Sequence, residues 1–273
     1  MGFDVDLRWR GCPCYAVIIQ AHSRESKMTS MIRVALLAYN EGESIASVLL
    51  QLNQHLTAAG ASFRVYVVND GSTDDTVVKV EELRGELPLT VLNHETNLGE
   101  ARAFDTGLRA ALVDSEPDDV IVTMEADGTS QPAVVSAMAG KIHEGCDVVC
   151  ASRYCAGGGY AHFPWKRRLF SVGANWMLGL LYPITGVRDY TIFFRAYRAS
   201  LLQDAFAHYG EELIKARGFV SNAEILVKVR PFNPKASECA LMYDYSLKKS
   251  ASNMNVWRNT AEYFKFMWDQ ISK

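Results

Sequence analysis

The stretch that decides the fold is VIVTMEAD, residues 120–127. Its first five residues are apolar or β-branched, a pattern typical of a strand that is buried on both faces of a parallel sheet. Glu125 and Asp127 follow where this strand runs out. Because open α/β sheets bind ligands at the carboxyl ends of their strands, two carboxylates at this point predict a site for a nucleotide and a divalent cation.

Strands and helices alternate around this stretch. Further strands are predicted over residues 32–38, 63–68, 89–93 and 147–151. Apolar spacing and helix-starting residues predict helices after Ser44, from Asp74 or Asp75 to Leu83, along the face of Ala101, Phe104, Leu108 and Ala111, and from Pro132 to about Glu144. This alternation is typical of an α/β fold with a mainly parallel central sheet and helices on both faces. Beyond Ser152 the pattern is less regular.

The composition is that of a globular protein that can bury a core. The chain has 273 residues, of which 49% are hydrophobic, and a formal net charge of −3. That charge gives no general attraction to nucleic acid, so we expect no nucleic-acid partner. The six cysteines lack the spacing of a zinc site, and a chain this long needs no disulfide framework, which favours free thiols in a reducing cytoplasm.

The hydropathy pattern contains no apolar run that approaches the roughly 20 residues of a membrane-spanning helix. We therefore expect a cytoplasmic protein that either is soluble or lies on the cytoplasmic face of the membrane. Residues 1–30 carry mixed charge and only a short apolar stretch, and the first clear strand begins at Ile32. They are predicted to be an N-terminal extension outside the core.

Short acidic and glycine-bearing signatures stand at the ends of the predicted strands. They are Tyr39-Asn40-Glu41, Asp70-Gly71-Ser72, Asn97-Leu98-Gly99, Glu125-Ala126-Asp127 and Ser152-Arg153-Tyr154. In this order and spacing, the segment from residue 32 to about residue 254 resembles an inverting family 2 glycosyltransferase of the nucleotide-diphospho-sugar transferase (GT-A) fold. Within that family it is most similar to dolichol-phosphate mannose synthase and its bacterial polyprenyl-phosphate relatives.

The resemblance implies a metal-dependent, inverting transfer of one sugar from a nucleoside-diphosphate sugar to a polyprenyl phosphate. The donor would be GDP-mannose or a UDP-sugar, and the acceptor a dolichyl or undecaprenyl phosphate at a membrane surface. It also implies a single glycosyltransferase domain over residues 31–253, with a donor half at 31–155 and an acceptor half at 156–253. Residues 254–273 are predicted separately, from their apolar spacing, to form an amphipathic C-terminal helix.

Site residues are carried over from the family by position. The donor contacts are Tyr39, Glu41, Asp70, Glu125, Arg153, Glu224 and Lys248. Glu125 and Asp127 correspond to the metal-binding element, with Mg²⁺ or Mn²⁺ as the cofactor, because two hard carboxylate oxygens at a strand end can face one ion. The resemblance gives catalytic roles to Asp127, Asp189 and Arg195.

A basic and aromatic segment follows the last of these signatures. By the resemblance, the acceptor contacts are Lys166, Arg167, Arg168 and Ser171. If the segment is helical, one apolar stripe is formed by Trp165, Leu169, Val172, Trp176 and Leu180. Cations beside apolar side chains suit an interfacial helix or a groove for a lipid phosphate. A core helix whose basic first turn is solvated is the alternative.

Several positions depart from the family pattern. Glu125 replaces an aspartate of the family pattern, Phe193 and Ser250 each replace a glycine, and Asn253 replaces a lysine. Glu100-Ala101 replaces a second glycine after Gly99. The first four of these departures leave open a nucleotide-sugar-binding protein without turnover. The other alternative is a transferase of the same fold that acts on a glycan or another hydroxyl acceptor. In that case a carboxylate such as Asp189 would take the proton of the hydroxyl.

Overall fold

The computed structural model describes residues 30–218, 220–249, 262–263 and 265–266. The predicted extension over residues 1–30 lies outside the described residues except for Ser30. The predicted C-terminal helix over residues 254–273 lies outside them as well, apart from the four residues 262, 263, 265 and 266.

The main sheet has seven strands in the order β3-β2-β1-β4-β7-β5-β8. The strands are β1 (Ile32–Ala38), β2 (Phe63–Asn69), β3 (Leu89–Asn93), β4 (Val120–Glu125), β5 (Val148–Ser152), β7 (Arg195–Arg198) and β8 (Ala236–Ala240). All neighbours pair in parallel except β7, which is antiparallel to both β4 and β5. The predicted mainly parallel α/β sheet is confirmed, and the five predicted strands are present.

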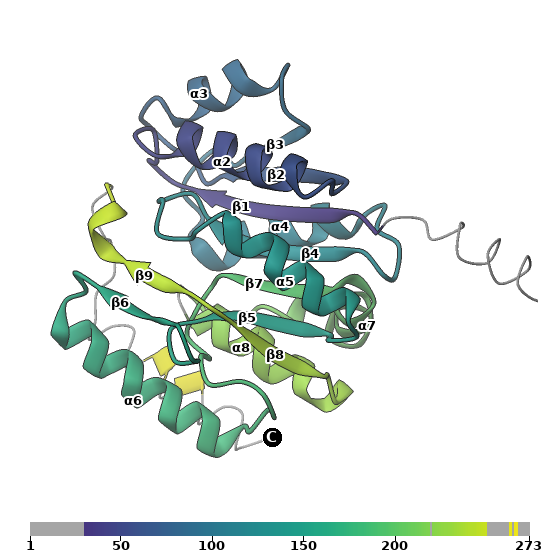
Figure 1. Cartoon of the computed structure of the whole chain (residues 1–273), viewed down its shortest axis with the longest axis vertical. Coiled ribbons are helices and arrows are strands. Elements are labelled where there is room, and N and C mark those ends of the chain that lie inside the picture. Colours follow the sequence, from purple (N-terminus) through teal and green to yellow (C-terminus); the bar gives the residue numbers. More distant parts are fainter. Residues whose placement is uncertain (1–29, 219, 250–261, 264, 267–273) are drawn as a thin grey trace, which may run out of the picture. The chain divides into compact units, whose positions relative to one another are not determined.

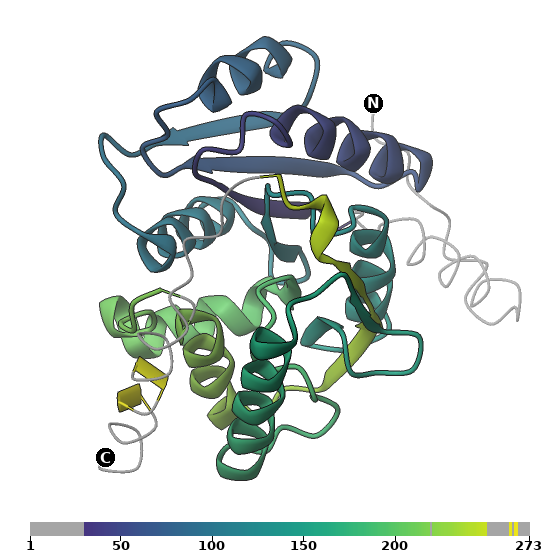
Figure 2. The same cartoon turned by 90° about the vertical axis from the view of Figure 1, so that its left-hand side faces the viewer.

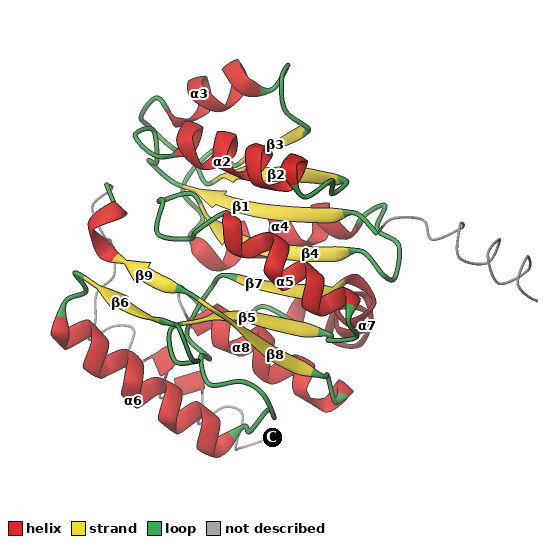
Figure 3. Cartoon of the chain, in the orientation of Figure 1, coloured by secondary structure: helices red, strands yellow, loops and turns green. Residues whose placement is uncertain are grey.

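Helices cover both faces of this sheet (Figure 3). The helices α2 (Ile45–Ala58), α3 (Thr76–Leu83) and α5 (Ala133–His143) lie along one face, and α4 (Glu100–Leu112), α7 (Ala199–Tyr209) and α8 (Val220–Val229) lie along the other (Figure 1). Short 3₁₀ turns are η2 (Gly210–Glu212), η3 (Arg230–Phe232) and η4 (Tyr245–Leu247). Every residue of β1 is buried, as expected for a strand between two helical layers.

The register of the central strands brings the predicted signatures to one edge. Ala38 pairs with Asn69, and Leu37 pairs with Glu125, so β1, β2 and β4 end at the same level. Backbone hydrogen bonds continue one residue further, from the amide of Asp70 to the carbonyl of Ala38 (2.9 Å). The residues that follow these strands therefore share the carboxyl edge of the sheet.

Gly71 and Asp70 hold the loop that leads into α4. Gly71 has φ = 70°, and a Cβ there would lie 2.4 Å from the carbonyl carbon of Thr96. The carboxylate of Asp70 accepts hydrogen bonds from the backbone amides of Leu98 and Gly99, both at 2.9 Å, and lies 2.7 Å from His94 Nδ1. This close approach of two loops places the N-terminus of α4 beside the ends of β2 and β4.

A second, two-stranded sheet lies next to the carboxyl edge. It pairs β6 (Gly159–Ala161) in parallel with β9 (Met242–Asp244) and is followed by η4. The helix α6 (Trp165–Leu181) begins just after β6, and Figure 2 shows β9 and η4 running from it toward the ends of β1 and β2. This connection carries the late loop at Lys248 back to the residues that follow β4.

Candidate active site

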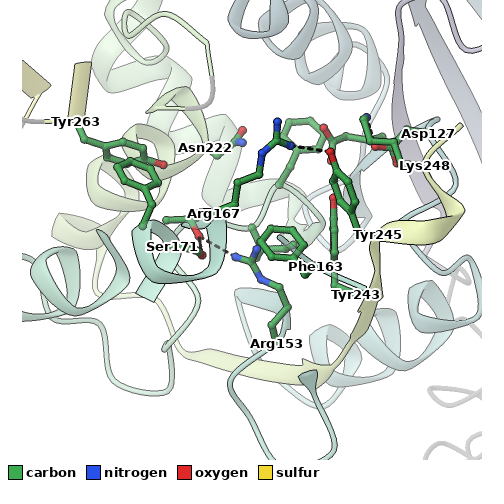
Figure 4. Close-up of a pocket in the computed structure, with 15 residues that line it drawn as sticks. Asp127, Arg153, Phe163, Arg167, Ser171, Asn222, Tyr243, Tyr245, Lys248 and Tyr263 are labelled. Carbon is green, nitrogen blue, oxygen red and sulfur yellow. Dashed lines mark hydrogen bonds and ion pairs between the residues drawn. The ribbon is translucent and has the colours of Figure 1, made fainter. Parts of the chain in front are cut away.

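A cavity of about 120 Å³ lies at the carboxyl end of β4 (Figure 4). Its lining combines carboxylates, cations and aromatic rings: Glu125, Asp127, Arg153, Phe163, Arg167, Phe170, Ser171, Thr191, Ile192, Phe193, Asn222, Tyr243, Tyr245, Lys248 and Tyr263. Small-molecule sites usually measure roughly 300–1,000 Å³. This cavity therefore has room for one part of a nucleotide sugar and not for the whole molecule.

Glu125 and Asp127 form the acidic end of the cavity. Asp127 Oδ1 accepts hydrogen bonds from the amide (2.9 Å) and hydroxyl (2.6 Å) of Thr129, and its Oδ2 accepts one from Lys248 Nζ (2.6 Å). Burial, and then the negative charges of Asp127 and Glu100, raise the pKa of Glu125 well above its ordinary value. The acidic end thus carries more potential negative charge than Lys248 alone balances.

These two carboxylates fit a divalent cation. A cation beside them would favour the ionised form of Glu125, which burial now disfavours. Among the described residues, no group of three or more His, Cys, Asp or Glu side chains gathers to hold a metal. The remaining ligands of Mg²⁺ or Mn²⁺ would be phosphate oxygens of a bound nucleotide and water, which is how Mg²⁺ is usually held in phosphate sites.

Lys248 lies at the same end of the cavity. Although burial disfavours its charged form, the charges of Asp127 and Glu125 raise the pKa of the Lys248 ammonium. It therefore stays protonated at neutral pH and supplies a fixed positive charge next to the carboxylates.

Arg153 is held under the opposite side of the cavity by Asp189. Arg153 Nε donates to Asp189 Oδ2 at 2.7 Å and Nη2 donates to Oδ1 at 2.6 Å, and the backbone amide of Arg153 also donates to Oδ2 at 3.1 Å. Asp189 is fully buried and does not line the cavity, whereas Arg153 does. Asp189 is therefore a positioning residue for Arg153, since a two-pronged carboxylate fixes the plane of a guanidinium.

The predicted acceptor residues divide into two pairs. Arg167 and Ser171 line the cavity, and Arg167 Nη1 donates to the hydroxyl of Tyr245 at 2.8 Å. The other two lie outside the lining: Lys166 Nζ lies 5.7 Å from the ring centre of Trp165, and the guanidinium of Arg168 lies 5.5 Å from that of Tyr160. Neighbours on a helix point in different directions, so one turn cannot aim three successive cations at one cavity.

Arg195 and Glu224 are placed in the supporting structure. Arg195 is buried and donates to the backbone carbonyls of Tyr190 (2.7 Å) and Asn222. Glu224 accepts from the backbone amide of Ala216 at 2.7 Å and from Lys228 Nζ at 2.6 Å. Neither residue lines the cavity. The structure does not bring them to the cavity, because both side chains satisfy the backbone of loops that hold α8 in place.

Three predicted donor residues lie at the ends of β1 and β2, outside the lining of this cavity. Both carboxylate oxygens of Asp70 accept hydrogen bonds from backbone amides of the loop before α4. Glu41 Oε2 accepts from the hydroxyl of Ser44 at 3.1 Å, and Tyr39 is half-buried just after β1. The carboxyl edge thus continues beyond the cavity toward these residues, which stay predicted donor contacts.

Several lining residues were not predicted from the sequence. They include Asn222 on α8, Phe163 before α6, Tyr243 on β9, Tyr245 in η4 and the described residue Tyr263. Burial, followed by the charges of Glu125 and Asp127, raises the pKa of Tyr243, so its hydroxyl remains protonated and can donate a hydrogen bond. Aromatic residues in core strands look the same in sequence, and no spacing rule distinguishes these from packing residues.

The predicted apolar stripe of α6 faces solvent. Trp165 is 70% exposed, Trp176 71%, Leu169 67% and Leu180 65%, while the opposite side of the helix buries Ala174 and Leu178. The alternative that this stripe is a core face is therefore wrong. Contiguous apolar surface of this kind usually marks a binding or membrane-contact surface. Within the described parts of the chain, no helix combines the length and hydropathy needed to cross a bilayer.

The mixed sheet, with its acidic carboxyl edge and the helices on both faces, is that of a GT-A glycosyltransferase. The sequence model of glycosyl transferase family 2 matches residues 34–206, and the chain belongs to this family. The predicted family and fold are thereby confirmed.

Curated relatives share about a third of the aligned residues. The chain is 32% identical over 181 residues to a polyprenol monophosphomannose synthase of Mycolicibacterium smegmatis, which covers 64% of each chain. It is 30% identical over 198 residues to a dolichol-phosphate mannosyltransferase of Pyrococcus furiosus, which covers 72% of this chain and 52% of the relative. An undecaprenyl-phosphate mannosyltransferase of Micrococcus luteus is 33% identical over 170 residues, or 60% of this chain and 65% of the relative. The chain thus spans between about half and two thirds of the length of these relatives.

Solved structures share the fold. Glucosyl-3-phosphoglycerate synthase from Mycobacterium tuberculosis, in complex with Mn²⁺, UDP and glucosyl-3-phosphoglycerate, superposes with a TM-score of 0.61 at 20% identity, covering 86% of this chain and 76% of that one. The same enzyme with Mg²⁺ and UDP gives a TM-score of 0.60 at 20% identity, covering 90% of this chain and 79% of that one.

Proposed function

We propose that this chain transfers one sugar, with inversion, from a nucleoside-diphosphate sugar to a polyprenyl phosphate in a metal-dependent reaction. The names of three relatives describe mannosyl transfer to polyprenyl lipids, which makes GDP-mannose the first donor to test and a UDP-sugar the second. Mg²⁺ or Mn²⁺ is the proposed cofactor, and Asp127 is the proposed ligand common to the metal site and the catalytic centre.

The observation that carries this proposal is the composition of a single cavity. Glu125, Asp127, Arg153, Arg167 and Ser171 all line it. We place a sugar held in the cavity between a metal-bound diphosphate and a phosphate acceptor. Reacting groups held in this order need little further help, because alignment alone supplies much of the rate of a two-substrate reaction.

Different residues of the cavity stabilise the leaving group and orient the acceptor. When bound, a divalent cation supplies charge stabilisation for the departing diphosphate, and Glu125 and Asp127 are the residues that would hold it. Lys248 adds a positive charge beside the same phosphates. Arg153 and Arg167 orient the acceptor phosphate, and Ser171 offers it a hydroxyl donor. A phosphate is already ionised at neutral pH, so no general base is required.

The hydroxyl-acceptor alternative is less well supported by the site. It needs a carboxylate that can take a proton, and Asp189 was the predicted candidate. Asp189 is fully buried and both its oxygens bind Arg153. Asp189 also does not line the cavity, so it is not placed to meet the hydroxyl of an acceptor bound there.

We further propose that the enzyme works on the cytoplasmic face of a membrane. The exposed apolar stripe of α6 lies on the same helix as Arg167 and Ser171, which line the cavity. An apolar face lying in the headgroup region, with cations at one end, would place a lipid phosphate at the cavity. Lys166 and Arg168, which lie outside the cavity, would attract anionic headgroups in this arrangement.

The test is a transfer assay with the full chain, Mn²⁺, labelled GDP-mannose or a UDP-sugar, and undecaprenyl or dolichyl phosphate in vesicles. We expect a lipid-linked product that is lost with chelator and with Asp127→Asn. Asp204→Asn, at an exposed position on α7, is the matched control and should retain activity. Donor hydrolysis without lipid product would contradict the acceptor assignment. Metal-dependent donor binding without any turnover would identify a binding protein instead.

A further inference from the structure

The cavity contains one buried polar atom whose partner is missing among the described residues. Asn222, in the first turn of α8, is 1% exposed and lines the cavity, and its Oδ1 accepts no hydrogen bond from any described group. Buried polar atoms are almost always paired, and an unpaired one calls for an explanation. Figure 4 shows the amide end of Asn222 turned toward the cavity.

The other end of the same amide is fixed. Asn222 Nδ2 donates to Glu100 Oε1 at 3.0 Å, and these residues are 122 positions apart in the chain. Glu100 is in the first turn of α4, where the loop held by Asp70 and Gly71 places it. This hydrogen bond fixes the orientation of the amide, and the carbonyl oxygen is its unpaired acceptor.

The position of the unpaired oxygen indicates what kind of ligand it meets. Asn222 lines the same cavity as the two carboxylates and the two arginines, between which the proposed function places the transferred sugar. A sugar presents hydroxyl groups, which donate hydrogen bonds, whereas a phosphate or a bare carbonyl offers only acceptors. An amide oxygen without a donor is therefore complementary to the sugar and to neither phosphate.

We propose that Oδ1 of Asn222 accepts a hydrogen bond from one hydroxyl of the transferred sugar, and that Glu100 holds the amide in this orientation. The inference rests on the proposed function and adds a specificity-determining residue to it. Glu100 acts through Asn222 and is a positioning residue. It also occupies one of the places where the sequence departs from the family pattern.

The test measures donor binding, so that it does not depend on the acceptor. The probe is whichever of GDP-mannose and UDP-glucose binds the full chain with Mn²⁺, compared by calorimetry with its 2-, 3-, 4- and 6-deoxy sugar forms. The wild-type chain is expected to bind one deoxy form about 10-fold more weakly, the usual scale of one net hydrogen bond. Asn222→Ala is expected to bind the parent donor about 10-fold more weakly and to lose this discrimination.

Variants of Glu100 and a neighbouring control complete the experiment. Glu100→Gln keeps the acceptor for Nδ2 and should retain the discrimination, whereas Glu100→Leu should lose it, and all variants should bind the free nucleoside diphosphate equally. Ser221→Ala removes a hydroxyl on α8 that donates to Gly218 and should behave as wild type. The inference is overturned if Asn222→Ala discriminates the four deoxy forms as the wild type does, or if Glu100→Leu retains full discrimination.

The outcomes separate this inference from the proposed function. If a donor binds and the deoxy pattern depends on Asn222, but no polyprenyl phosphate is glycosylated, the acceptor assignment fails and the sugar contact stands. If neither donor binds with Mn²⁺, both fail together.

Discussion

Lys248 and Asp127 form an ion pair of 2.6 Å although they are 121 residues apart in the chain. The pair closes the late loop after η4 onto the strand end of β4. Its ammonium group occupies one of the carboxylate oxygens that a divalent cation would use. Lys248 and a divalent cation would therefore compete for Asp127. Bound phosphates would end this competition, because they attract both the ammonium group and the cation.

Replacing Lys248 should separate its competition with the metal from its contribution to turnover. In Lys248→Met we expect tighter binding of Mn²⁺ alone, because no ammonium competes for Asp127, together with turnover that is about 10²–10³-fold slower, the range for losing one charge-stabilising group. Calorimetry with Mn²⁺ and steady-state kinetics measure the two effects. Lys249→Met, next in the chain and outside the cavity lining, is the control. Weaker Mn²⁺ binding in Lys248→Met would contradict the competition.

Removing the partner of Arg153 should cost stability. Asp189→Asn leaves a buried guanidinium without its counter-charge, and breaking a buried pair in this way costs about 3–5 kcal/mol. Urea unfolding measures the change in the free energy of unfolding. The double variant Arg153→Met with Asp189→Asn should recover part of the loss, since no buried charge is then left unpaired. A single variant as stable as the wild type would show that Asp189 does not position Arg153.

The stability of the protein should depend on pH through Glu100. Burial, only partly offset by the hydrogen bond from Asn222 and the charge of Lys248, raises the pKa of Glu100 from 4.5 to about 8. The folded state therefore holds this proton more tightly than the unfolded state. The resulting stabilisation is complete below pH 4.5 and is lost as the pH rises to about 8.

The comparison of Glu100→Gln with the wild type isolates this effect. The variant cannot ionise at position 100. The melting temperature of the variant minus that of the wild type should therefore increase as the pH rises from 5 to 8, with no further increase above about pH 9. Thermal unfolding with chelator present measures the difference. Glu82→Gln, at an exposed position on α3, is the control substitution. A constant difference for Glu100→Gln would mean that Glu100 titrates normally.

The exposed stripe of α6 should govern membrane binding. Leu169→Ser and Leu180→Ser each remove an apolar side chain that burial in lipid would stabilise by about 1.5–3 kcal/mol, so each should lower vesicle binding roughly 10- to 100-fold. Vesicle sedimentation measures binding, and the melting temperature should not fall because both side chains are already exposed. Val113→Ser, 69% exposed on another surface, should bind as wild type. Unchanged sedimentation of both leucine variants would contradict the membrane surface.

Much of the donor half could be predicted from the sequence, because local patterns determine it. The apolar run of β1 and the helical spacing of α2 are short-range signals, and the strand ends follow from them. The metal-binding pair is also local, since Glu125 and Asp127 flank a single residue at the end of β4. These parts of the prediction needed no knowledge of distant contacts.

The rest of the site depends on tertiary contacts that sequence spacing does not encode. Asn222 and Tyr243 reach the cavity from α8 and β9, about 100 residues or more after β4. The positive charge of Arg195 predicted a contact with phosphate, but the side chain is buried and donates hydrogen bonds to backbone carbonyls. A family motif identifies which residue is present, whereas only the packing around Arg195 and Asp189 separates a supporting role from contact with the ligand.

The backbone around Gly71 leaves no space for a side chain. Any side chain there would meet the backbone of Thr96 and Asn97, at 2.4 and 2.5 Å, and neither can move without displacing the start of α4 and with it Glu100. If all twenty amino acids were sampled at codon 71 and the pool were selected for turnover, we expect only glycine to survive. A position that contributes no side chain to the site would thus be as intolerant of variation as the acidic pair itself.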